Sequence, residues 1–117
     1  MIKEIKLGER TLTLNANGAT PVRFKMTFGE DLIKDLGSSQ NDASSLPDTV
    51  AQLTYIMNKQ ALKEASNLSF DDYLLWLEEF EDPTVFLQNS ADIMSFYLQN
   101  VKTSSKAKNS KGPQSAK

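Results

Sequence analysis

Two short runs of apolar and polar side chains begin the chain. In the first run, residues 2–7, the apolar residues are Ile2, Ile5 and Leu7, and in the second, residues 11–15, leucines alternate with polar residues. A period of two residues is typical of a half-buried strand. Gly8 lies between the runs, so the pattern predicts a β-hairpin with its turn near Gly8. A lone hairpin is marginally stable in water, and we therefore expect its apolar face to pack on the helices that follow.

The segment after the hairpin carries two patterns at once. Every fourth residue from Phe24 to Leu36 is apolar, as on one face of a helix, although residues 22–28 also alternate as in a strand. Thr20 as an N-cap, with Pro21 at the first helical position, favours the helix. We therefore expect a helix that opens at this Thr-Pro pair.

Glycines divide this part of the chain. We expect Gly29 to kink the helix or to split it in two, and Gly37 to end it. Residues 38–45 are almost entirely polar and predict a mobile loop. A second helix is predicted from about Pro47 to about Ala65. Its apolar stripe consists of Leu46, Val50, Leu53, Met57 and Ala61.

Two further helices are predicted towards the C-terminus. Ser69, with Asp72 three residues later, has the spacing of a capping box and opens a helix that ends near Phe80. Asp82, followed by a proline, opens a last helix that runs to about Lys102. Its core-facing seam is predicted to be Leu87, Ala91, Met94, Leu98 and Val101.

Additional large apolar side chains lie outside that seam and in the preceding helix. They are more than a small monomeric core is expected to cover, so we expect part of them to face a partner. The predicted partner-binding residues are Trp76, Phe80, Phe86, Ile93, Phe96 and Tyr97. Trp76 also belongs to a group of apolar residues in one short helix, for which core packing is the favoured role and a partner-binding patch the other. The group is Phe70, Tyr73, Leu74, Trp76, Leu77 and Phe80.

Together these elements predict an α+β fold, mostly α, with an N-terminal β-hairpin packed on about four helices. One globular domain is expected at residues 1–102, which suits a chain of 117 residues. Residues 103–117 are rich in lysine and serine and poor in apolar side chains, so a disordered tail is expected there. The lysines that characterise this flexible tether are Lys102, Lys106, Lys108 and Lys111.

The composition narrows the possible functions. The chain contains no cysteine and no histidine, which removes thiol nucleophiles, Ser-His dyads and the usual zinc ligands. The glycines are too widely spaced for a phosphate-binding loop, so no cofactor is expected. Apolar runs are far shorter than the roughly 20 residues of a membrane span, and we expect a soluble, intracellular protein with no membrane partner.

The charges are unevenly distributed. Residues 102–117 carry five lysines and no acid, which leaves 8 basic against 15 acidic residues in the body. The basic tail permits an alternative function as a small nucleic-acid-binding regulator, but no aromatic side chains accompany the lysines and the acidic body would repel nucleic acid. We therefore expect no nucleic-acid partner.

Six acidic residues fall between residues 71 and 82. A divalent-cation site or a carboxylate enzyme is one interpretation of this cluster. A solvated helix face is the favoured interpretation, because the EF-hand loop pattern is absent, and we predict neither a metal site nor catalysis. The six are Asp71, Asp72, Glu78, Glu79, Glu81 and Asp82.

The body, from about residue 1 to residue 101, resembles the tail assembly chaperones of long-tailed phages and prophages of Gram-positive bacteria. The resemblance rests on the order of the elements and on packing and capping segments. These segments are Ile2 to Leu7 with Leu12-Thr13-Leu14-Asn15-Ala16, Ala19-Thr20-Pro21-Val22-Arg23-Phe24, Phe28-Gly29-Glu30-Asp31-Leu32, and Phe70-Asp71-Asp72-Tyr73-Leu74.

The resemblance implies a non-enzymatic chaperone. Such a protein would coat the aggregation-prone tape measure protein in the host cytoplasm while tail tube subunits polymerise, and would be absent from the mature virion. It also implies self-association into a homo-oligomer, and a frameshift-extended form that recruits tail tube protein. The flexible tail from about Lys102 would be a suitable tether for that extension.

Overall fold

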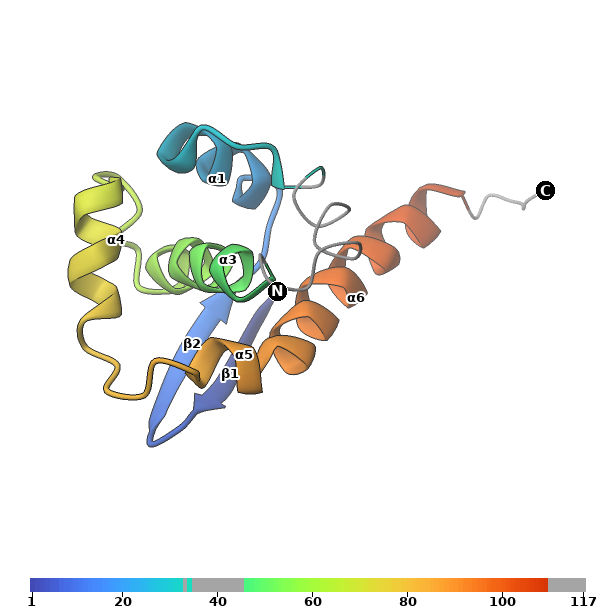
Figure 1. Ribbon diagram of the computed structural model, residues 1–117. Coiled ribbons are helices and arrows are strands. Elements are labelled where there is room, and N and C mark those ends of the chain that lie inside the picture. The colour runs from blue at the N-terminus through green and yellow to red at the C-terminus, as the bar shows by residue number, and fades with distance from the viewer. Residues whose placement is uncertain (33, 35–45, 110–117) are drawn as a thin grey trace.

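The chain folds as α+β, mostly α, with an antiparallel hairpin at the N-terminus, as predicted. The computed structural model describes residues 1–32, 34 and 46–109, with the side chains of 1–32, 34 and 48–99 (Figure 1). The predicted mobile loop at 38–45 and the predicted helix end at Gly37 lie outside the described residues. The elements are β1 (Ile2–Leu7), β2 (Arg10–Asn15), α1 (Thr20–Phe28), α3 (Leu46–Ala61), α4 (Phe70–Leu77), α5 (Val85–Gln88) and α6 (Ser90–Asn109).

Helix α3 lies at the centre of the molecule. It contacts β2, α1, α4, α5 and α6. In Figure 1 the hairpin lies below α3, α1 lies above it, and α4 and α5–α6 lie on either side. Residues from all of these elements therefore share one core.

The hairpin confirms the alternation read from the sequence. Leu7 pairs with Arg10, so the connection is the two-residue turn Gly8-Glu9. Gly8 has a φ of 64°, and glycine at the first position is typical of a type II′ hairpin turn. One face of the hairpin is buried, as the pattern predicts, by Ile5, Leu7, Leu12 and Leu14.

Helix α1 opens differently from the prediction. Its N-cap is Ala19, which makes no side-chain capping bond. The Thr20 side chain is buried instead and its hydroxyl accepts hydrogen bonds from the Asn17 amide at 3.0 Å and from Gln60 Nε2 at 2.9 Å. Gly29 is the left-handed C-cap, with a φ of 71°, and residues 32 and 34 are helical again, so Gly29 splits the predicted helix, as one of the two expected outcomes, and does not kink it.

Helix α3 ends at Ala61 and not near Ala65 as predicted. The Glu64 amide donates to the Lys59 carbonyl at 2.9 Å, and the Lys63 amide donates to the Gln60 carbonyl at 3.2 Å. This is the Schellman pattern of helix termination. It places Lys63 in the left-handed region, with a φ of 59°, where glycine is the usual residue.

Helix α4 starts as predicted: the Ser69 hydroxyl caps it by accepting from the Asp72 amide at 3.0 Å. The helix ends at Leu77, before the predicted end at Phe80. The backbone carbonyl of Trp76 accepts from Glu79, and that of Leu77 accepts from Phe80, so tighter turns follow the last helical residue.

The predicted single last helix is broken at Asn89. Asp82 Oδ1 accepts from the Thr84 amide at 2.8 Å and from its hydroxyl at 2.7 Å, which fixes the turn before α5. After this one short helix, Asn89 Nδ2 donates to the Val85 carbonyl at 2.8 Å, and a new helix, α6, begins at Ser90. α6 continues to Asn109, beyond the predicted end at Lys102, so the backbone of 103–109 is helical where disorder was predicted.

Two buried amide side chains of α3 join the hairpin to the helices. Asn58 Nδ2 donates to the Thr13 carbonyl of β2 at 3.0 Å, and Asn58 Oδ1 accepts from Trp76 Nε1 of α4 at 3.1 Å. Gln60 Nε2 donates to the Asn15 carbonyl at 2.6 Å. Because these amides are 4% and 6% exposed, water cannot easily replace their partners.

We predict that Asn58→Ala destabilises the fold by about 2–4 kcal/mol, because it leaves the Thr13 carbonyl and the Trp76 indole N–H buried without partners. Thermal unfolding followed by circular dichroism should show a midpoint lowered by more than about 8 °C. Asn67→Ala, at an exposed position, is the matched control and should unfold close to the parent. Equal midpoints for the two variants would contradict the role given to Asn58.

Candidate functional site

The residues predicted to bind a partner through the last helix lie in the core. Phe86, Ile93, Phe96 and Tyr97 are each at most 6% exposed. This corrects their assignment to a surface. Burial also raises the pKa of the Tyr97 hydroxyl above its ordinary value.

The predicted core seam of the same helix faces outwards instead. Leu87 is 54% exposed and Leu98 is 44% exposed, while Met94 is half-buried. The predicted partner-binding residues and the predicted seam lie on neighbouring faces of this segment. The face that carries aromatic rings and isoleucine is buried, because these side chains remove more apolar area from water. The predicted seam residue Val101 lies beyond the described side chains.

Trp76 and Phe80 belong to an aromatic cluster that holds α3, α4 and α5 together. The Trp76 ring centroid lies 5.5 Å from that of Tyr55, 5.0 Å from that of Phe80 and 5.7 Å from that of Phe86. Trp76 is buried and Phe80 is half-buried against the core. Trp76 and Phe80 therefore pack in the core.

Tyr55 connects this cluster to the acidic segment. Its hydroxyl donates to Asp72 Oδ2 at 2.6 Å, and Lys59 Nζ lies 3.8 Å from the same oxygen. Burial, and then the hydrogen bond to Asp72, raise the pKa of Tyr55 well above its ordinary value. Asp72 therefore has a structural role.

Two other acids of the cluster at 71–82 also have structural partners. Glu79 Oε1 lies 3.1 Å from Arg10 Nη1, and Asp82 accepts from Thr84, hydrogen bonds that lower the pKa of the Asp82 carboxyl. Within the described part of the chain, no three acidic residues are grouped so that they could hold a metal ion.

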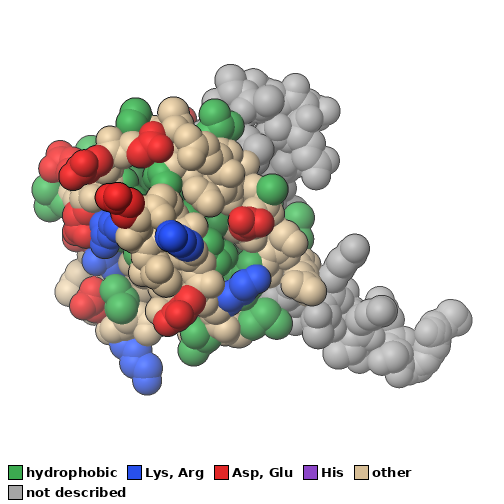
Figure 2. Space-filling view, turned by 90° about the horizontal axis from the view of Figure 1, so that it is seen from below, with side chains coloured by type: hydrophobic (Ala, Val, Ile, Leu, Met, Phe, Trp, Pro, Cys, Tyr) green, Lys and Arg blue, Asp and Glu red, His purple; other side chains and the backbone are tan. Residues whose placement is uncertain are grey.

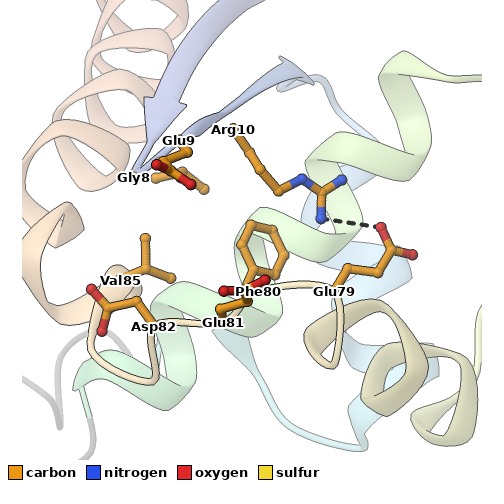
Figure 3. Close-up of a pocket in the computed structure, with 9 residues that line it drawn as sticks. Gly8, Glu9, Arg10, Glu79, Phe80, Glu81, Asp82 and Val85 are labelled. Atoms are coloured by element: carbon orange, nitrogen blue, oxygen red, sulfur yellow. Dashed lines mark ion pairs between the residues drawn. The ribbon is translucent and has the colours of Figure 1, made fainter.

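A hollow of about 400 Å³ lies where the hairpin turn meets the segment between α4 and α5 (Figure 3). The Arg10 guanidinium lies 4.7 Å from the centre of the Phe80 ring and also pairs with Glu79. Four carboxylates line this hollow against one guanidinium, so its charge favours cationic groups. The carboxylates are those of Glu9, Glu79, Glu81 and Asp82.

The outer face of α4 presents large apolar side chains to solvent. Phe70 is 51% exposed, Leu74 is 41% exposed and Leu75 is 62% exposed, whereas Tyr73 and Trp76 on the inner face are buried. The sequence pattern grouped Phe70 and Leu74 with Trp76, and the structure divides this group between two faces. We define the α4 outer face as Phe70, Leu74 and Leu75.

Other exposed apolar side chains lie on α1. Val22 and Met26 of α1 are 57% and 81% exposed. Figure 2 shows hydrophobic side chains at several separate places on one side of the molecule, with acidic side chains between them. The predicted apolar face of this helix, with Phe24 and Phe28, leaves Val22 and Met26 on the other side.

Comparison of the chain with protein-family models, with curated proteins and with solved structures gives no match. Over the described residues, no helix combines the length and the apolar character that a membrane span requires.

We predict opposite effects of one substitution at two neighbouring positions of α6. Phe96→Glu should prevent folding, because a carboxylate forced into the core costs several kcal/mol, whereas Leu98→Glu should fold like the parent. Circular dichroism and thermal unfolding of both variants provide the measurement. A well-folded Phe96→Glu protein would show that Phe96 is a surface residue, as the sequence pattern suggested.

Proposed function

We propose that this protein is a tail assembly chaperone that binds the tape measure protein and keeps it soluble by covering its apolar surface, without catalysis. The observation that carries the proposal is the α4 outer face, where three large apolar side chains are exposed on a helix of eight residues. The proposal includes action in the host cytoplasm and absence from the mature virion, as the resemblance to phage chaperones implies.

The α4 outer face is suited to binding because its helix is held firmly from behind. The inner face packs Tyr73 and Trp76 against α3, and Ser69 caps the first turn. A helix that is already ordered loses little conformational entropy when a partner docks on it. Apolar stripes of helical partners are commonly recognised by such helix packing.

Acidic residues lie next to these apolar side chains. Asp71 lies in the first turn of α4, and Glu78 and Glu79 follow its last turn. Charges beside apolar side chains oppose non-specific association, while the apolar side chains supply the binding energy. This arrangement supports a reversible holding action that needs no nucleotide.

The proposal also includes a homo-oligomer and a role for an extended form. The exposed side chains of Leu87 on α5 and Leu98 on α6 offer further apolar surface for self-association. Recruitment of tail tube protein is assigned to a frameshift-extended product that would continue from the C-terminal tail.

We predict that co-expression with the parent protein increases the soluble fraction of the tape measure protein and that Leu75→Glu abolishes this effect. Leu75 is 62% exposed, so the variant should fold normally while placing a charge in the binding face. Ile2→Glu is the matched control, because Ile2 is 65% exposed but lies on the hairpin. ATP should not change the outcome.

The soluble fraction is measured with the parent, with each variant and without chaperone. Equal fractions with and without the parent would reject the chaperone function. Binding to DNA or RNA that weakens steeply with salt would then favour the nucleic-acid-binding regulator.

A further inference from the structure

A groove runs between α1 and the segment that follows α3, and its charge is opposite to that of the body. We define the α1 groove by its apolar residues Val22, Met26, Ala65 and Leu68 and by its basic residues Arg23 and Lys63. It consists of two hollows, of about 410 and about 320 Å³, that share Arg23, Ala65 and Ser66. No carboxylate lines either hollow.

The two basic residues of the groove are not neutralised by the acids described around them. The ion pairs between described residues involve Arg10 and Lys59, and neither Arg23 nor Lys63 takes part in one. Arg23 Nη1 instead donates to Gln60 Oε1 at 2.9 Å, which anchors the guanidinium at the edge of the groove. The body has 8 basic and 15 acidic residues, so a site lined by two basic side chains and no carboxylate differs in charge from the rest of it.

The backbone conformation of Lys63 is unfavourable for a lysine. Its φ of 59° is the left-handed conformation that closes the Schellman pattern after α3, and glycine adopts it without strain. Within the described residues, it is the only residue other than glycine with a positive φ. A lysine at this strained position, lining a groove, is explained if its charge has a function there.

We propose that the α1 groove binds an acidic amphipathic segment of the partner protein. One apolar side chain of that segment would pack against Met26 and Leu68, and a neighbouring carboxylate would pair with Arg23 and Lys63. The charge complementarity selects this occupant, since the acidic surface elsewhere on the body repels such a segment. The inference rests on the proposed function for the partner's identity, which makes the occupant an acidic stretch of the tape measure protein.

The test uses two labelled synthetic helical peptides with the same leucine stripe, flanked by glutamates in one and by lysines in the other. Fluorescence anisotropy should show that the full-length parent binds the glutamate peptide at least about ten-fold more tightly than the lysine peptide. Lys63→Gly should weaken binding of the glutamate peptide about five-fold, in the range of a partly exposed ion pair. Met26→Glu, at a position 81% exposed, should abolish it.

Two controls separate binding from folding. Lys63→Gly should raise the thermal midpoint by about 2–6 °C while it weakens binding, because glycine relieves the left-handed strain. Lys3→Gln, which removes an exposed lysine from the hairpin, should change neither the midpoint nor the affinity.

Equal affinity for the two peptides, or binding of the glutamate peptide that is insensitive to both groove variants, would overturn the inference. The soluble fraction of the tape measure protein is a separate measurement. If the parent binds the glutamate peptide but does not solubilise the tape measure protein, the proposed function is rejected and binding of an acidic segment in the α1 groove is supported. If the Lys63→Gly and Met26→Glu variants solubilise that protein as well as the parent does, the role of the α1 groove is rejected and the proposed function is supported.

Discussion

The arrangement of the whole molecule depends on two buried amides of one helix. Asn58 and Gln60 of α3 hydrogen-bond the backbone of β2, and the same side chains reach Trp76 of α4 and Thr20 of α1. A buried amide that loses its partner costs more than the hydrogen bond contributes. Asn58 and Gln60 bind carbonyls two residues apart on the same edge of β2, Thr13 and Asn15, so a shift of the hairpin along α3 by one residue would break both hydrogen bonds. The amides therefore fix the register in which the other elements pack.

This constraint also determines which surfaces remain free. With α3 surrounded by the hairpin and four helices, each neighbour commits one face to the core and leaves the other to solvent. For α4 the free face is apolar, and for α1 it borders a basic groove. The acidic hollow lies at the hairpin turn, and α1 lies at the opposite end of the molecule (Figure 1).

The separation of charge gives a physical basis for selective binding by a protein of this size. Apolar contacts supply most of the affinity but discriminate poorly between partners, whereas fixed charges reject segments of the wrong sign. A chaperone that must cover one long partner without aggregating benefits from apolar contacts and from fixed charges. The α4 outer face and the α1 groove could serve these two purposes on one rigid body.

The sequence by itself determined the elements whose signals are local. The hairpin and the Ser69 cap depend on hydrogen bonds and periods that span only a few residues, so they could be predicted. The predicted cap at Asp82 was wrong, because Asp82 instead closes a turn on Thr84 and the helix begins at Val85. Tertiary structure alone decided which of two adjacent apolar stripes of α6 is buried. Phe96 entered the core and Leu98 did not, because the cluster around Trp76 and the elements packed across the helix determine how much area each stripe can bury. The surfaces proposed to bind were likewise decided by the tertiary structure, since a surface is the part that the core leaves uncovered.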